Sequence, residues 1–421
     1  MKIAVFGATL QAAVMSALWA ETGHQVYWCQ GIEETCAPGL TLDTQLLELL
    51  SRQKHLGNLN ETSLSSLKED IDVYFFGFNP SCFQEALDIV QHLSRQPIIH
   101  PKLMINGSTF GLKGTASLQK ILAKDAWVYL PDMIQEGKSA ESFTHSREVV
   151  IGIDEKYYDF AQTQTRELLR PFFPLSQQYL FMPILDAEFT KLSISGMLAT
   201  RISYMNDLAQ VAEKLHIDIE NVRLGLGADS RIGSSYLQPG VGFGGDNFSR
   251  DILTLSETMS SSGTNSRLLQ QVWEINEQQK EILFRKLWNY YCCDLQGKTV
   301  AIWGAAFKEN TSSTINSPVH TMLEALWAQQ VTVKLHDPAA LPDLENYYGK
   351  REDLILCRNP YEAVQDAHAL CLMTAWKAYW SPDYSRLKQL MAHPMILDGR
   401  NIYDPAYVRA QGFAYEGVGR I

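Results

Sequence analysis

Three features that would place this 421-residue chain in a common functional class are missing from its sequence. Acidic residues outnumber basic ones, 47 Asp and Glu against 36 Lys and Arg, and the formal net charge is -11. Binding to phosphate backbones usually needs clustered Lys and Arg, so we expect no nucleic-acid partner, although a basic pocket for one nucleotide fits this balance. The seven cysteines are scattered apart from the neighbours Cys292 and Cys293, and no CxxC pair or histidine cluster has metal spacing. We therefore expect a reduced, cytoplasmic chain that holds no metal.

Long apolar runs are also scarce, and the first twenty residues come nearest to one. MKIAVFGATLQAAVMSALWA combines a lysine, an apolar run and small residues, as a signal peptide does. Gly7, Thr9 and Gln11 interrupt that run, and the order of β-branched residues followed by helix formers is typical of a strand, a turn and a helix. We favour the strand-turn-helix interpretation and expect no membrane span.

Short apolar runs alternate with helical patterns at both ends of the chain. Such alternation predicts a parallel sheet with helices on both faces. The runs lie at residues 2–7, 25–30, 72–78, 103–107, 126–130 and 147–153, and again at 298–304, 331–337, 368–374 and 395–399.

The middle of the chain has no strand pattern, and its three helical patterns span residues 187–212, 248–259 and 266–291. The flanking regions open alike, with KIAVFGATLQAA and KTVAIWGAAFKE, each a strand that ends in glycine. We predict an α/β fold in which two Rossmann-like doubly wound domains are joined by a central helical domain with a long helix. The predicted domains are residues 1–185, 186–292 and 293–421.

The turn after the first strand departs from the dinucleotide-binding pattern G-x-G-x-x-G/A. Gly7 and Ala12 fit the pattern, but Thr9 stands at the second glycine, where the absence of a side chain lets the backbone approach the pyrophosphate. The second strand ends in Gln30, and an amide binds ribose hydroxyls without the charge-assisted strength of a carboxylate. Two alternatives stay open here: a Rossmann fold that no longer binds NAD well, and one whose NAD binding is merely weakened.

Several motifs together are more specific than this turn. The strongest are KLSISGMLATRISYMNDLAQVAEKL and GLGADSRIGSSYLQPGVGFGGDNFSRD, and they are joined by GKTVAIWGAAFKENTSSTINSP, DGRNIYDP and the weaker LPDMIQEG. In this order, from Lys2 to Arg420, the sequence closely resembles the nucleotide-sugar dehydrogenases, the UDP-glucose/GDP-mannose dehydrogenase family. The resemblance implies the fold predicted above and a central region that mediates dimerisation and contacts substrate.

The resemblance also implies a reaction for which this chain lacks the nucleophilic cysteine. The family oxidises C6 of a nucleotide-bound sugar twice with two NAD⁺, and its cysteine forms a thioester that is then hydrolysed to a uronate. In this sequence Asn247 stands at the cysteine position, and a carboxamide cannot form a thioester. Asp251 keeps the acidic position of the loop, or supports a helix N-terminus, while Arg250 replaces a lysine.

Other catalytic positions of the family are partly kept. Lys191 matches the lysine that stabilises the sugar oxyanion, and Ser195, one helical turn further on, replaces its partner asparagine. Thr109 matches a threonine near the nicotinamide and the substrate. Glu136 matches a glutamate implicated in proton handling, and Asp132 replaces a nearby glutamate.

The substrate side is better preserved than the cofactor side. Ser312, Ser313 and Ile315 replace an acidic pair and an arginine that faces the cofactor. Two arginines also allow a purely structural interpretation. The family residue at the position of Arg231 reaches the neighbouring subunit's ligand, but Arg231 could be a surface charge. Arg400 could be a phosphate contact or a structural ion-pair residue. The substrate-binding positions implied by the resemblance are Arg231, Tyr236, Leu237, Gly244, Gly245, Lys308 and Arg400.

Since the losses concentrate on the redox side, we predict a homologue that binds a UDP- or GDP-sugar but cannot run the oxidation to a uronate. It would be a pseudoenzyme or partner subunit in polysaccharide biosynthesis, a homodimer with weakened NAD binding. The long, apolar-rich middle helix is compatible with dimerisation. Two alternatives are an active NAD-dependent oxidoreductase that needs no thiol, and an interaction protein with both pockets closed.

Overall fold

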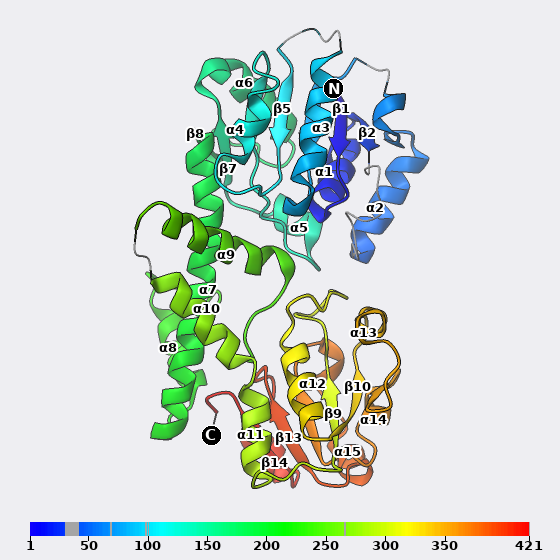
Figure 1. The fold of residues 1–421 in the computed structure, drawn as a ribbon, viewed down its shortest axis with the longest axis vertical. Coiled ribbons are helices and arrows are strands. Elements are labelled where there is room, and N and C mark those ends of the chain that lie inside the picture. Colours follow the sequence, from blue (N-terminus) through cyan, green and yellow to red (C-terminus); the bar gives the residue numbers. More distant parts are fainter. Residues whose placement is uncertain (30–41, 68–69, 97–98, 100, 265–266, 421) are drawn as a thin grey trace. The chain divides into compact units, whose positions relative to one another are not determined.

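The computed structural model describes residues 1–29, 42–67, 70–96, 99, 101–264 and 267–420 (Figure 1). Contacts divide the chain into two compact units, Met1–Ile194 and Ser195–Ile421. The boundary falls inside α7, a continuous 32-residue helix from Ile184 to Leu215. The division into three domains stays a prediction.

The first unit contains an eight-stranded sheet in the order β3-β2-β1-β4-β5-β6-β7-β8. Because the chain leaves β1 in one direction and returns on its other side at β4, the sheet is doubly wound. Its strands are Lys2–Phe6, Gln25–Cys29, Leu59–Glu61, Val73–Phe76, Leu103–Asn106, Ala126–Tyr129, Val149–Ile153 and Tyr179–Pro183 for β1 to β8. Its other helices are Leu10–Glu21, Thr44–His55, Phe83–Ser94, Gly114–Gln119, Ser139–Thr144 and Tyr158–Leu169 for α1 to α6.

The second unit contains a six-stranded sheet in the order β11-β10-β9-β12-β13-β14, in which all neighbours are parallel. Its strands are Thr299–Trp303, Thr332–His336, Leu354–Leu356, Ala369–Leu372, Met395–Asp398 and Ala414–Gly417 for β9 to β14. Helices α8 to α11 precede the sheet at Ile219–Ala228, Asp246–Ser261, Leu268–Gln279 and Ile282–Tyr290. Helices α12 to α16 are Pro318–Ala328, Leu341–Tyr348, Pro360–Ala363, Tyr384–Leu390 and Pro405–Ala410.

Each sheet is buried on both faces, which explains why its central strands are mostly apolar. In β1, Ile3 and Val5 join one hydrophobic cluster while Phe6 joins the cluster on the opposite face. The same alternation in β9 sends Ile302 and Trp303 to opposite clusters. Because helices cover both faces of a doubly wound sheet, its buried strands show no alternation of polar and apolar side chains.

The predicted fold class is confirmed, including the strand and helix at the start of the chain. Two details differ. β7 runs antiparallel to β6, so the first sheet is not wholly parallel. The predicted helix at 266–291 is two helices, α10 and α11, that meet at Lys280 and Glu281.

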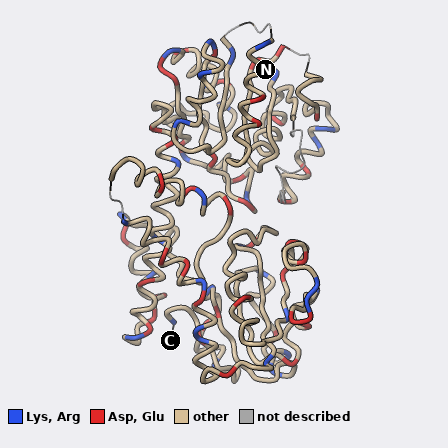
Figure 2. The backbone as a smooth tube through the Cα atoms, in the orientation of Figure 1, with Lys and Arg blue, Asp and Glu red and all other residues tan. Residues whose placement is uncertain are grey.

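Charged residues of both signs are interspersed along both units (Figure 2). Within the described residues, every helix is too short or too polar to span a bilayer.

Candidate functional site

The turn after β1 is built around Gly7 and Thr9. Gly7 has φ +103°, and a Cβ there would collide with the carbonyl of Gly77. Thr9 is the N-cap of α1: its Oγ1 accepts a hydrogen bond from the Ala12 N–H (3.2 Å) and donates one to the Gly77 carbonyl (2.9 Å). The hydroxyl thus occupies the helix N-terminus at which a dinucleotide pyrophosphate is normally held.

Gln11 links the turns at the same edge of the sheet, a role that the sequence pattern did not indicate. Its side chain is buried and donates a hydrogen bond to the Leu130 carbonyl at the end of β6 (3.1 Å). The residue pattern of α1 gives no sign of this, because every position from Gln11 to Ala20 is buried. Gln30, the predicted ribose ligand, lies outside the described residues.

Thr109 lies, half-buried, in the turn after β5. The Asn106 side chain braces this turn, accepting from the Ser108 N–H (2.9 Å) and donating to Thr115 Oγ1 (2.8 Å). After β6, Asp132 accepts a hydrogen bond from the Ile134 N–H (3.1 Å), and Glu136 is half-buried further along the same loop. Both loops follow the carboxyl ends of neighbouring strands, where doubly wound sheets bind ligands.

Glu188 is a structural residue of this unit that the sequence analysis missed. Its carboxylate is buried on α7 and accepts hydrogen bonds from the N–H groups of Lys113 (2.7 Å) and Thr115 (2.9 Å). Burial raises the pKa of Glu188 despite these bonds. Lys191 is buried on the same helix, less than one turn further on. Glu188 therefore fixes the end of the Thr109 loop to the helix that carries Lys191.

In the second unit, the glycine-rich loop packs against protein backbone. A Cβ on Gly244 would lie 2.5 Å from the Asn316 carbonyl oxygen, and one on Gly245 would lie 2.9 Å from the Phe307 ring. Gly245 has φ +88° and donates its N–H to the Ile315 carbonyl (2.9 Å). The two glycines are thus required for close contact with the loop after β9.

Two side chains from α10 clamp the loop from its other side. Asn276 accepts from the Phe243 N–H (2.8 Å) and donates to the Phe243 carbonyl (3.1 Å). Gln279 donates to the Gly240 carbonyl (2.7 Å), and Asn206 of α7 accepts from the Gly240 N–H (2.8 Å). These amides satisfy the backbone of a buried loop that forms no sheet or helix.

Helix α9 begins directly at the end of this loop. Gly245 is its N-cap, and Asp246 in the first turn forms an ion pair with Arg250. Asn247 follows Asp246 and is exposed within the chain. Ser195 donates a hydrogen bond to Asp251 Oδ2 (2.7 Å), and both residues are buried. The structure thus joins the serine and the aspartate of the predicted site, and the residue at the cysteine position is exposed.

The predicted substrate residues differ widely in their surroundings. Leu237 is buried, whereas Tyr236 has φ +59° and is 40% exposed. Arg231 is exposed and pairs with Asp229 (2.6 Å), two residues earlier, as a plain surface charge would.

Arg400 supports the loop that carries Lys308. Its Nε donates to the Met373 carbonyl (2.6 Å) and its Nη2 to the Phe307 carbonyl (3.1 Å). Burial lowers the pKa of Arg400 from its usual value. The Lys308 ammonium lies over the Phe307 ring, 5.7 Å from its centroid. Arg400 therefore fixes the backbone next to Lys308.

At the three positions where an acidic pair and an arginine of the family are replaced, Ser313 makes backbone contacts and Ile315 is exposed. The Ser313 carbonyl accepts from the Phe307 N–H (3.1 Å), and Ile315 is 46% exposed. Ser312 is half-buried beside them. Across the described residues, His, Cys, Asp and Glu side chains form no group of three or more that could hold a metal.

The chain has two doubly wound sheets, each with a glycine turn after its first strand, and a glycine-rich loop that leads into a helix. These features define a dehydrogenase-type α/β protein. Residues 185–278 match the model of the UDP-glucose/GDP-mannose dehydrogenase family, central domain, and residues 301–405 match the family's UDP binding domain. A UDP-glucose 6-dehydrogenase of Pseudomonas aeruginosa is 32% identical over 446 aligned residues, which cover 100% of this chain and 98% of that protein. The chain belongs to the UDP-glucose/GDP-mannose dehydrogenase family.

Solved structures agree on the fold. A UDP-glucose dehydrogenase from Pyrobaculum islandicum superposes with a TM-score of 0.88 at 22% identity and covers 100% of this chain and 98% of that one. A UDP-D-ManNAc dehydrogenase from Pyrococcus horikoshii gives a TM-score of 0.82 at 20% identity, covering 100% and 99%.

Proposed function

We propose that this protein binds a UDP- or GDP-sugar and does not run the cysteine-dependent oxidation to a uronate. The observation that carries the proposal is Asn247 at the start of α9, where the resemblance places the nucleophile. An amide nitrogen is delocalised into its carbonyl and is no nucleophile under these conditions, whereas thioester chemistry needs a thiolate. The protein then acts as a pseudoenzyme or a partner subunit in polysaccharide biosynthesis.

The surroundings of other cysteines support the loss of thiol chemistry. Burial raises the pKa of Cys29 to about 12 and that of Cys357 to about 11. It also raises the pKa of Cys371, which is fully buried. Thiols that stay protonated at neutral pH are poor nucleophiles, so none of these three replaces the missing group.

The turn after β1 supports weakened NAD binding. The Thr9 hydroxyl accepts the Ala12 N–H, and its side chain stands where a pyrophosphate needs close approach to the backbone. On the substrate side, Arg400 fixes the loop that carries Lys308 through two carbonyl groups. The Thr9 side chain in the turn after β1 and the fixed loop beside Lys308 together favour a nucleotide sugar over a dinucleotide as ligand.

We infer a homodimer from the exposed face of α7. Met197, Tyr204 and Val211 recur every seven residues and are 63%, 54% and 50% exposed, and Leu215 extends the stripe at 62%. A long apolar stripe of this kind on a helix is normally covered by another element.

Thermal shift measurements test the ligand. Purified protein is heated with UDP-glucose, GDP-mannose, NAD⁺ or NADP⁺, singly and in pairs. A ligand present at ~100 times its Kd and bound only to the folded state stabilises it by roughly 2.7 kcal/mol. We expect a nucleotide sugar to raise Tm and NAD⁺ to leave it unchanged; the reverse pattern refutes the proposal.

The buried Ser195–Asp251 hydrogen bond favours a second candidate, an NAD-dependent nucleotide-sugar oxidoreductase that needs no thiol. This pair keeps a carboxylate at the family's acidic position with a hydroxyl partner 2.7 Å away. Oxidation of an alcohol to an aldehyde requires a base but no covalent nucleophile. An NADH signal that saturates at one equivalent per sugar identifies this candidate and excludes the first.

A further inference from the structure

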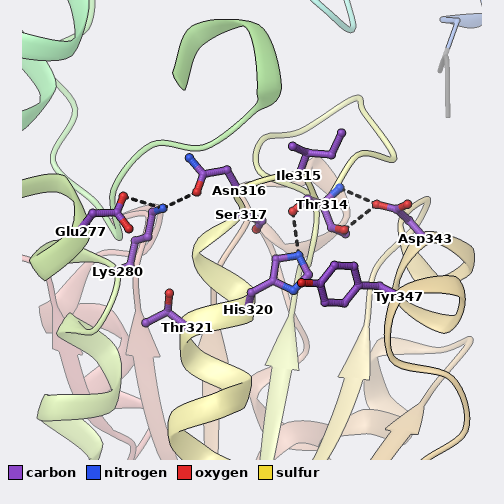
Figure 3. A pocket seen from close by; sticks show the side chains of 10 residues that line it. All are labelled: Glu277, Lys280, Thr314, Ile315, Asn316, Ser317, His320, Thr321, Asp343 and Tyr347. Atoms are coloured by element: carbon purple, nitrogen blue, oxygen red, sulfur yellow. Dashed lines mark hydrogen bonds and ion pairs between the residues drawn. The ribbon is translucent and has the colours of Figure 1, made fainter. Parts of the chain in front are cut away.

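A pocket of ≈350 Å³ lies within the second unit, at the carboxyl ends of β9 and β10 (Figure 3). Its walls come from the loop after β9, the first turn of α12, helix α13 after β10, and the end of α10. β9 is the first strand of this sheet and lies between β10 and β12, which is where a doubly wound sheet reverses its order. In such sheets the residues after the second strand, here β10, hold the ribose of a nucleotide.

Asp343 supplies acceptor capacity near this end of the sheet, seven residues beyond β10, whereas Asp337 directly after the strand is buried and accepts the N–H groups of Ala305 and Ala306. It lies in the first turn of α13, and Thr314 donates to it twice, through its N–H (2.8 Å) and its hydroxyl (2.5 Å). Both bonds end on Oδ2, so the carboxylate is held in one orientation while Oδ1 keeps its lone pairs for a ligand. A carboxylate fixed in this way can accept hydrogen bonds from vicinal hydroxyls.

Lys280 and Thr321 supply donor capacity on the opposite wall. Lys280 is only 3% exposed, and its ammonium contacts Glu277 (2.8 Å) and the Asn316 amide oxygen (2.7 Å). An ammonium has three N–H groups, so these two acceptors leave one N–H on an ammonium that also lies 5.8 Å from the centroid of the Trp273 ring. Thr321 turns its hydroxyl toward the same space (Figure 3). The pocket thus offers fixed donors and acceptors together, which suits a ligand that carries hydroxyl groups.

Aromatic rings form the third wall. The Tyr347 ring packs beside His320 with centroids 4.8 Å apart, and Tyr347 is 68% exposed. His320 is fixed by hydrogen bonds with the Tyr348 hydroxyl (2.7 Å) and the Thr314 carbonyl (2.9 Å), and burial lowers its pKa. The histidine is therefore neutral near pH 7, and the wall presents flat, uncharged surface to a ligand.

We propose that this pocket binds the ribose of a nucleoside or nucleotide, with Asp343 accepting from the vicinal hydroxyls and Tyr347 packing against the base. Lys308 and Arg400 are not part of its lining, so the pocket is a second site beside the nucleotide-sugar site proposed above. It does not depend on that site being functional. Both the position after β10 and the mixed lining favour the same chemical class of ligand.

Calorimetric titration of the full chain tests the proposal. Adenosine and uridine are each compared with their 2′,3′-dideoxy analogues, and D-ribose is titrated alone. We expect the ribonucleosides to bind and the dideoxy analogues to bind at least about tenfold more weakly, because they lack the partners of a charged acceptor. Asp343→Asn should reduce ribonucleoside affinity to a similar extent, since its amide still accepts from Thr314 but loses the charge.

Glu345→Gln is the matched control, because it removes the same charge from an exposed position of the same helix. It should leave affinity unchanged, and thermal melts of both variants report folding. Tyr347→Ala gives a second, independent loss. Equal binding of ribonucleosides and dideoxy analogues, unchanged affinity in Asp343→Asn, or no binding of any nucleoside overturns the proposal. So does D-ribose binding as tightly as the nucleosides, or loss of nucleoside binding in Lys308→Ala.

Discussion

At the scale of single residues, the proposed loss of uronate formation rests on Asn247 and Thr9 together. Asn247→Cys restores a thiol at the start of α9, where the helix N-terminus favours a thiolate. We expect this variant to form no uronate, because Thr9 still obstructs the cofactor turn. Product analysis after incubation with UDP-glucose and NAD⁺ checks the expectation, and full activity in the single variant contradicts it.

Thr9→Gly isolates the cofactor turn. Removing the side chain frees the Ala12 N–H and should increase NAD⁺ affinity, measured by calorimetry. Glycine is a tolerated N-cap, so we expect a stability loss of only a few tenths of a kcal/mol from the cap itself. Thr9→Ser keeps the hydroxyl and serves as the control; an equal gain in affinity for both variants refutes the role of the Thr9 hydroxyl.

Sequence alone predicted which side chains were replaced, but not how the new ones are used. Asn247 is visible from its place in the motif, whereas the bond from Thr9 to the Gly77 carbonyl joins residues 68 positions apart. Gln11 and Glu188 are buried polar residues whose partners, Leu130 and the amides at the start of α4, are equally remote in sequence. Nothing in local periodicity reports such contacts.

At the scale of elements, the central strands could be predicted and the edges could not. Strands buried on both faces read as apolar runs, as β1 and β9 do. β3 and β11 are three-residue edge strands, and Leu59–Glu61 contains only one apolar residue. The antiparallel pairing of β7 depends on how its connection returns to the sheet, which the composition of the strand does not encode.

Glu188 gives a prediction for the contact between α7 and α4. Its two oxygens each accept one backbone N–H, whereas glutamine offers a single acceptor oxygen. Glu188→Gln should therefore cost about 1–3 kcal/mol at pH 7 by leaving one N–H unpaired. Urea unfolding measures this cost. The control is Glu345→Gln, which makes the same change at an exposed position, and an equal loss of stability in both variants contradicts the prediction.

The same variant should alter the pH dependence of stability. Because the folded-state pKa of Glu188 is raised, the native protein binds more protons than the unfolded chain over that range. The stability added by this proton uptake is fully present below the unfolded pKa of Glu188 and is lost as pH rises through the folded pKa, while the two N–H groups that the carboxylate accepts stay paired. Unfolding free energies measured from about pH 4 to 7 should therefore fall less steeply in the variant, and an unchanged slope argues against this assignment.

At the scale of the whole molecule, the repeated motif predicted the two sheets but not the different side chains that follow the first strand of each. Each sheet begins with a strand and a glycine turn, which the sequence repeats as KIAVFG and KTVAIWG. The first turn is capped internally by Thr9, while the second unit carries a polar pocket beside the loop after β9. A shared motif thus predicts the fold of both units but not which of them holds a ligand.

The exposed stripe of α7 gives the final prediction, which concerns assembly. Met197, Tyr204, Val211 and Leu215 form an apolar face that water would contact in a monomer. Val211→Glu places a charge in the middle of this face, where burial against a second copy would leave it without a partner. We expect the wild-type chain to run as a dimer in size-exclusion chromatography with light scattering, and Val211→Glu to shift it toward monomer. Lys214→Glu, which changes charge at an exposed position of the same helix but outside the stripe, should leave the dimer intact; a monomeric wild type, or equal dissociation by both variants, rules out this face as the interface.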